Sequence, residues 1–107
     1  MSGWNREQRI ARNERLLREH NWEVYREALE PAPGASDQDT ELVLLCACGR
    51  ESCKADLLVT IAEYRAAHET PHRFIVAPGH VSPEMERVIE RHERYWVVEK
   101  LPAFRAP

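Results

Sequence analysis

The sequence predicts an α+β protein in which a long N-terminal helix precedes a small domain with a short antiparallel sheet and one or two helices. The first observation behind this prediction is that residues 5–30 lack Gly and Pro and carry apolar side chains at helical spacing. The second is a segment rich in Pro and Gly at residues 31–36, which ends the helix. The third is a series of short apolar runs further along, bounded by turn residues and typical of strands.

The predicted N-terminal helix is amphipathic. Ile10, Leu17 and Val24 recur every seven residues and form an apolar stripe. Glu14 stands one turn before Arg18, a spacing that favours an ion pair on an exposed helix face. The stripe would pack on the rest of the chain, on a second copy or on another protein. We expect this helix to mediate contact with a protein partner or self-association.

The segment rich in Pro and Gly is the predicted boundary between the parts of the chain. After it, Thr60 and Glu63 have the spacing of a capping box and predict a short helix that stops at Thr70-Pro71. The apolar runs around this helix predict the strands 42–45, 55–60 and 73–77 and a last strand at 95–98. The predicted organisation is a helix at 1–30, a linker at 31–41, a domain at 42–100 with its helix at 61–68, and a flexible tail at 101–107.

The sequence of residues 83–94 is compatible with two kinds of secondary structure, a helix and a β-hairpin. Ser82-Pro83-Glu84 is a good helix start, and Met85, Val88, Ile89 and His92 then follow one helical face. The rival is a β-hairpin in which residues 87–90 pair with the last strand. We favour the helix on its start signal.

Composition and charge exclude several classes of protein. The 107 residues carry 15 Lys and Arg against 18 Asp and Glu, a net charge of −3, which gives no overall attraction for nucleic acid. The longest apolar run, residues 42–48, is far shorter than the roughly 20 residues that cross a bilayer, so no membrane contact is expected. The first residues lack the apolar segment of a signal peptide, and we expect the protein in the cytoplasm.

The three cysteines of the chain, Cys46, Cys48 and Cys53, all fall within eight residues. A disulfide framework would need an even number in an oxidising compartment, so metal binding or redox chemistry remains. Thiolates spaced two to five positions apart on a turn can converge on a tetrahedral zinc ion, and Gly49 permits that turn. His80 is the best candidate for a fourth ligand because it also follows a predicted strand.

Other histidines are weaker candidates. His68 and His72 are alternatives to His80, whereas His20 and His92 lie on charged predicted helices and are interpreted as surface residues. Four protein ligands would close the coordination sphere, which favours a structural zinc over catalysis. Without the histidine, three thiolates and a water could support hydrolysis, with Glu51 or Glu84 as the base.

A resemblance can be stated on these residues. Cys46-Ala-Cys48, Cys53, Arg73-Phe-Ile-Val-Ala-Pro-Gly-His80 and Tyr95-Trp-Val-Val-Glu-Lys100 resemble a group of small, largely uncharacterised actinobacterial-type proteins. Members of that group are similar in pairing a long N-terminal helix with a cysteine knuckle and a Pro-Gly-His corner. The resemblance implies that Cys46, Cys48, Cys53 and His80 act as a set, and it implies no activity.

Five arginines of the N-terminal helix, from Arg6 to Arg18, recur every three residues. Each three-residue step turns a helix by about 300°, so the five spread over about 240° and form no single face. We interpret them as a solvated, ion-paired surface. The sequence therefore predicts a small zinc-stabilised protein, acting as a protein-interaction or regulatory module, that is not an enzyme. A thiol redox switch using Cys46 and Cys48 and a nucleic-acid-binding zinc protein are the alternatives.

Overall fold

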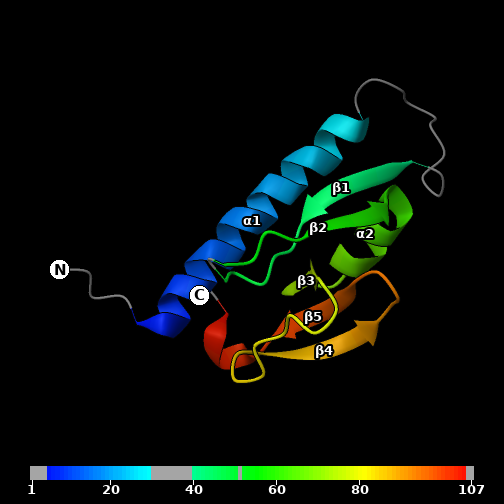
Figure 1. Cartoon of the computed structure of the whole chain (residues 1–107). Coiled ribbons are helices and arrows are strands. Elements are labelled where there is room, and N and C mark those ends of the chain that lie inside the picture. The colour runs from blue at the N-terminus through cyan, green and yellow to red at the C-terminus, as the bar shows by residue number, and fades with distance from the viewer. Residues whose placement is uncertain (1–4, 30–39, 51, 106–107) are drawn as a thin grey trace.

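The computed structural model describes residues 5–29, 40–50 and 52–105, and it confirms the α+β class. The long helix comes first, and two small antiparallel sheets and a second helix follow (Figure 1). Most of the predicted linker, residues 31–39, lies outside the described residues. The elements are α1 (Arg6–Leu29), β1 (Glu41–Leu45), β2 (Asp56–Thr60), α2 (Ile61–His68), β3 (Arg73–Val76), β4 (Glu86–Arg91), β5 (Trp96–Lys100) and a 3-10 helix, η1 (Pro102–Phe104).

The two sheets meet where β1 ends. Strands β1 and β2 form an antiparallel pair, and β5 lies between β3 and β4 in the second sheet. Just beyond β1, Cys46 N–H donates to Ala55 O at 3.0 Å, and Ala47 N–H donates to Ile75 O at 3.2 Å. The backbone at the start of the cysteine loop therefore joins β2 on one side to β3 on the other.

Helix α1 packs along β1 (Figure 1). The Asn21 side chain both donates to Leu45 O and accepts from Leu45 N–H, each at 2.9 Å. Of the predicted stripe, Ile10 is buried, and Leu17 and Val24 are partly buried. The stripe is therefore covered largely by the rest of the same chain, which is one of the three arrangements expected from the sequence.

The expected ion pair between Glu14 and Arg18 on an exposed face is wrong. Glu14 is fully buried, and its carboxylate accepts a hydrogen bond from Lys100 Nζ at the opposite end of the chain. The one-turn spacing was compatible with a surface pair, but the contact of α1 with β5 turns this residue inward. None of the helices among the described residues is long and apolar enough to cross a membrane.

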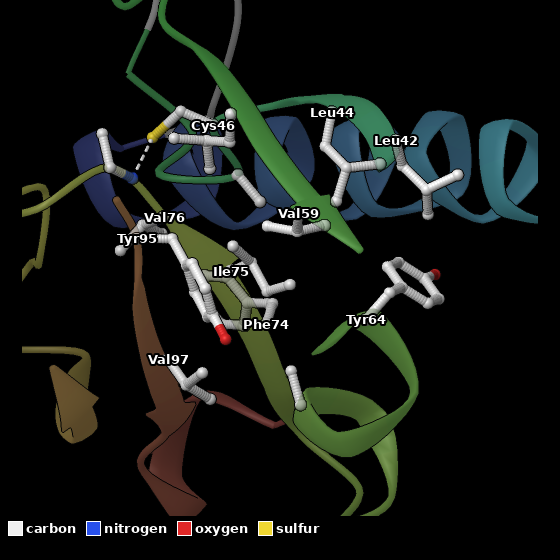
Figure 2. Packing of buried hydrophobic residues seen from close by; sticks show 14 of the residues in the cluster. Leu42, Leu44, Cys46, Val59, Tyr64, Phe74, Ile75, Val76, Tyr95 and Val97 are labelled. Carbon is white, nitrogen blue, oxygen red and sulfur yellow. Dashed lines mark hydrogen bonds between the residues drawn. The ribbon is translucent and has the colours of Figure 1, made fainter. Parts of the chain in front are cut away.

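The prediction for α2 is confirmed at both ends. Thr60 Oγ1 accepts from Glu63 N–H at 3.1 Å, and Glu63 Oε1 accepts from Thr60 N–H at 2.8 Å, which is the capping box read from the sequence. Ile61, Tyr64 and Ala67 form the buried face of the helix. Figure 2 shows side chains of β1, β2, β3 and β5 and Tyr64 of α2 converging in one core.

The helix preferred for residues 83–94 is wrong, and the rival hairpin is correct. Strand β4 pairs with β5 in a register that sets Glu86 opposite Lys100, with a bulge between Val88 and Glu90. The helix-start signal is real, but it makes a single turn in which Met85 and Glu86 N–H both donate to Ser82 O. Beyond that turn, β5 needs a second hydrogen-bonding neighbour, and pairing satisfies more backbone than an isolated helical turn.

Residues 101–105, part of the predicted tail, contact the second sheet. Leu101 N–H donates to Met85 O at 2.8 Å, and Arg105 Nε donates to Lys100 O at 2.9 Å. Arg105 also lies 3.6 Å from the Glu99 carboxylate. These contacts bring the end of the described chain close to the N-terminal half of α1 (Figure 1).

Candidate metal centre

The four residues proposed from the sequence as metal ligands lie together in the structure. The donor atoms of Cys46, Cys48, Cys53 and His80 are all within 4.8 Å of one another, and the group could hold a metal ion. Cys46 directly follows β1, Cys48 and Cys53 occupy the loop that leads to β2, and His80 follows β3. The group thus joins the ends of strands from both sheets.

Individual distances fit a tetrahedral site. The His80 Nδ1 atom lies 3.4 Å from Cys53 Sγ and 3.6 Å from Cys46 Sγ. In a tetrahedron with Zn–S of about 2.3 Å and Zn–N of about 2.0–2.1 Å, the sulfur and nitrogen atoms are about 3.6 Å apart. The cysteines are free and the four donors all lie within 4.8 Å of one another, so these distances are compatible with coordination of one ion.

Backbone groups orient the first cysteine. Ala77 N–H donates to Cys46 Sγ at 3.1 Å, the contact drawn as a dashed line in Figure 2. Hydrogen bonds from backbone N–H groups stabilise the negative charge of a metal-bound thiolate and fix its direction. Ala77 O in turn accepts from His80 N–H at 2.9 Å, so one residue aligns two of the four donors.

The thiols of Cys46 and Cys48 shift each other's pKa. Their mutual hydrogen bond is the main cause that lowers the pKa of Cys48 to about 4, with further bonds from the Arg50 backbone, His80 and Cys53 acting against burial. The same hydrogen bond to Cys48, together with burial, raises the pKa of Cys46. The lowered pKa favours the thiolate form of Cys48, which is the form that binds metals.

The loop can make this turn because of its glycine. Gly49 has a φ of +77°, in the region that favours glycine. Cys53 N–H donates a hydrogen bond to Arg50 O at 3.1 Å. A Cβ at Gly49 would also lie 2.5 Å from Ile10 O and 2.7 Å from Glu14 Cγ. The cysteine loop therefore fits closely against α1, and Asn13 Nδ2 bonds Gly49 O at 3.0 Å.

That contact between the loop and α1 was not predicted. Asn13 carries no sequence pattern that sets it apart from other polar residues on a helix, and its partner lies 36 residues away. The only local signal was Gly49, whose need for a positive φ explains the turn but not the close approach of the helix.

The other histidines and acids considered from the sequence are outside the cluster. His68 Nδ1 bonds Tyr64 O at 2.8 Å, and His92 Nε2 bonds Glu90 at 2.7 Å. Neither these residues nor His20 and His72 join the group of donors found among the described residues. Of the two candidate bases, Glu84 is paired with Arg6 at 2.7 Å, and Glu51 lies outside the part of the chain that the structure describes.

Comparisons with known proteins add no family to this geometry. No protein-family model matches the chain, and neither the curated proteins nor the solved structures contain a match. The resemblance to small actinobacterial-type proteins therefore stays a prediction.

Proposed function

We propose that Cys46, Cys48, Cys53 and His80 bind one zinc ion and that this ion has a structural role. The observation that carries the proposal is the separation of His80 Nδ1 from two of the sulfurs, 3.4 and 3.6 Å, which fits adjacent corners of a zinc tetrahedron. Three soft thiolates and one imidazole form a ligand set typical of structural zinc.

The position of the cluster supports a structural role over a catalytic one. Four protein donors fill a tetrahedron and leave no corner for water or substrate. The sheets that the cluster joins have only two and three strands, too few to bury much apolar surface on their own. A zinc ion at their junction would hold β1 against β3 and stabilise both.

The proposed wider role is that of a small interaction or regulatory module in the cytoplasm. The apolar stripe of α1 faces the chain's own core, so contact with a protein partner or a second copy would use the remaining face of the helix. Leu16 is 43% exposed there. Sedimentation of wild type and Leu16→Glu would test the second copy: a concentration-dependent dimer lost in the variant supports it, and a monomer at all concentrations contradicts self-association.

The zinc proposal is tested by measuring metal content and free thiols on the same purified sample. We expect about one zinc per chain, thiols that resist modification, and release of zinc with exposure of all three thiols when a strong chelator is added. Folded, metal-free protein that is indifferent to the chelator would contradict the proposal. If mild oxidation of such protein reversibly removes two thiols, the redox switch at Cys46 and Cys48 is the better explanation.

A further inference from the structure

A second candidate site lies between α1 and the turn that joins α2 to β3. The cleft there has a volume of about 360 Å³, and its walls include Arg15, Arg18, Trp22, His68, His72 and Arg73. We propose that this cleft binds one nucleotide unit, its phosphate held by arginines and its base placed against Trp22. The volume lies near the lower end of the range for small-molecule sites, roughly 300–1,000 Å³, and suits a single unit.

The charge of the cleft is opposite to that of the chain. Arg15, Arg18 and Arg73 line it against one carboxylate, Glu19, although the whole protein has a net charge of −3. Arg73 is held in place by Glu99, which its Nε contacts at 3.1 Å. An incoming phosphate would therefore meet a local concentration of guanidinium groups, the donors that best match phosphate oxygens.

Arg18 has unused hydrogen-bonding capacity. Its guanidinium lies over the ring of Phe74, 5.4 Å from the centroid, and its Nε atom is buried without a hydrogen-bond partner among the described residues. A guanidinium presents five N–H donors in a fixed plane. The face of an aromatic ring has no lone pair, so it does not accept a conventional hydrogen bond from any of them. Nε itself is shielded from the cleft, and an anion bound there would accept from the terminal N–H groups of Arg18, which lines the wall.

A row of aromatic rings borders the cleft. The rings of Trp22, Tyr25, Tyr64 and His68 form a row with centroid separations of 5.6, 4.5 and 4.1 Å, and both ends of that row line the cleft. Trp22 is 49% exposed at its end of the row. Because a base stacks on an aromatic ring with little dependence on its identity, Trp22 offers a platform for the base.

The His68 ring contributes an acceptor. Its Nδ1 lies 2.8 Å from Tyr64 O, to which only a protonated ring nitrogen can donate. In the neutral ring this bond leaves Nε2 without a hydrogen and able to accept one. Burial is the main cause that lowers the pKa of His68, with the charge of Arg18 adding to it, so the neutral form is favoured. An N–H or O–H of the nucleoside is a suitable donor.

His72 supplies an independent sign of constraint at the same place. Its φ of 68° makes it the one residue other than glycine with positive φ in the described part of the chain. Such backbone is unfavourable for a residue with a side chain and persists where the surroundings impose it, often at ligand sites. Here Lys100 N–H holds His72 O at 2.9 Å.

A second arginine-lined cleft lacks these features. It is lined by Arg6, Arg9 and Arg50 near the cysteine loop, with a volume of about 380 Å³ and no aromatic side chain. Its arginines have partners, as Arg6 does in Glu84 at 2.7 Å, but Arg73 of the first cleft is likewise paired with Glu99, so pairing does not separate the two clefts. The aromatic platform therefore selects the cleft at Trp22.

The test is calorimetric titration of the full-length protein, as purified, with AMP, adenosine and inorganic phosphate. AMP should bind at least tenfold more tightly than either fragment, because only AMP engages both walls. Arg15→Glu should weaken AMP binding at least tenfold and Trp22→Ala at least fivefold. Trp22→Phe should restore most of the loss. Arg12→Glu makes the same charge change on an exposed part of α1 outside the cleft and should alter affinity less than twofold.

A dodecathymidylate strand, titrated in parallel, identifies the source of the nucleotide. Binding at least tenfold tighter than that of AMP, and equally sensitive to Arg15→Glu, indicates a unit within single-stranded nucleic acid; weaker binding indicates a free nucleotide. The proposal is overturned if folded protein binds neither AMP nor the strand at millimolar concentration. Equal losses from Arg12→Glu and Arg15→Glu would also overturn it, because they would show general charge attraction.

Discussion

Two buried groups of polar side chains connect the elements of this protein. One is the metal centre, and the other is a charged cluster formed by Glu14, Glu86 and Lys100. The metal centre gathers donors that follow β1 and β3, and in our proposal an ion from solution completes it. The charged cluster joins α1, β4 and β5 through contacts between their own side chains. In the first, three of the four donors are local in sequence; in the second, the paired residues Glu14 and Lys100 are 86 positions apart.

The charged cluster is more deeply buried than most ion pairs. Glu14 is fully buried, and Glu86 and Lys100 are 1% and 4% exposed. Lys100 Nζ contacts the Glu14 carboxylate and lies 3.8 Å from Glu86 Oε2, while Ser82 N–H donates to Glu86 Oε1 at 3.0 Å. Two carboxyl groups thus share one ammonium.

Within this cluster, the pKa of Glu14 is shifted from its ordinary value. Burial is the largest cause that raises the pKa of Glu14 to about 8, and the neighbouring Glu86 adds to it, whereas Lys100 acts in the opposite direction. A raised pKa favours the protonated form of Glu14, which lowers the negative charge that is buried in the interior. In our account, the metal centre would satisfy its buried thiols with an external cation, whereas the charged cluster satisfies its carboxyl groups with a lysine of the same chain.

The largest expected effect is at the metal centre. Cys48→Ser should abolish stable zinc binding and unfold much of the domain, because structural zinc contributes on the order of 10 kcal/mol to small metal-dependent domains. His80→Ala should weaken binding but leave three thiolates. Metal content and circular dichroism measure both effects. His92→Ala removes a histidine that is 41% exposed and bonded to Glu90, and it should retain zinc and structure.

Lys100→Met should have the next largest effect. The variant leaves two buried carboxyl groups without their cation, and breaking a buried pair in this way costs about 3–5 kcal/mol. The free energy of unfolding in urea, at constant zinc, measures it. Lys54→Met provides the control, because Lys54 is exposed. A loss as large in the control, or none in Lys100→Met, would contradict the structural role of the charged cluster.

The pH dependence of stability separates the charged cluster from the metal centre. The folded-state pKa of Glu14, about 8, is above its ordinary value of 4.5, so the folded protein holds a proton that the unfolded chain releases between those values. This proton therefore contributes its full stabilisation below pH 4.5. As the pH rises to about 8 the contribution is lost, and the free energy of unfolding falls by a few kcal/mol in total.

Glu14→Gln mimics the protonated form and should reduce the fall in unfolding free energy between pH 5 and pH 8. Glu27→Gln, an exposed change on the same helix, should leave that slope as in wild type. Thermal or urea unfolding across this range measures the slope. The same slope in Glu14→Gln and in wild type would show that the cluster does not hold the proton.

The smallest expected effect concerns the contact between α1 and the cysteine loop. Gly49→Ala and Gly79→Ala both place a Cβ at positive φ, +77° and +83°. At Gly79 there is open space, whereas at Gly49 the new atom would lie 2.5 Å from Ile10 O. Gly49→Ala should therefore be more destabilising than Gly79→Ala by about 1–3 kcal/mol, since overpacking forces backbone shifts. Equal unfolding midpoints in urea would show that the helix does not press on the loop.

Features that depend on neighbouring residues were predictable from the sequence. The spacing of Cys46, Cys48 and Cys53 marked the cysteine loop, and Thr60 with Glu63 marked the start of α2. These devices are recognisable because their geometry is set within a few residues. His80 could be added because it follows a strand, as the cysteine loop does.

Features that depend on distant residues were not predictable in the same way. The sequence pattern at Ser82 forms a single turn and not the predicted helix, because whether a turn continues into a helix or a strand is decided by β5, which lies further along the chain. Glu14 matched an ordinary surface position on a helix. Its burial depends on Lys100, and no local pattern connects the two.

X-ray absorption at the zinc edge tests the central claim most directly. For protein purified with zinc, we expect three sulfur ligands at about 2.3 Å and one nitrogen ligand at about 2.0–2.1 Å, consistent with Cys46, Cys48, Cys53 and His80. His80→Ala should lose the nitrogen contribution, and His92→Ala should retain it. A zinc ion surrounded by oxygen and nitrogen alone, or a nitrogen contribution that survives in His80→Ala, would contradict the proposed centre.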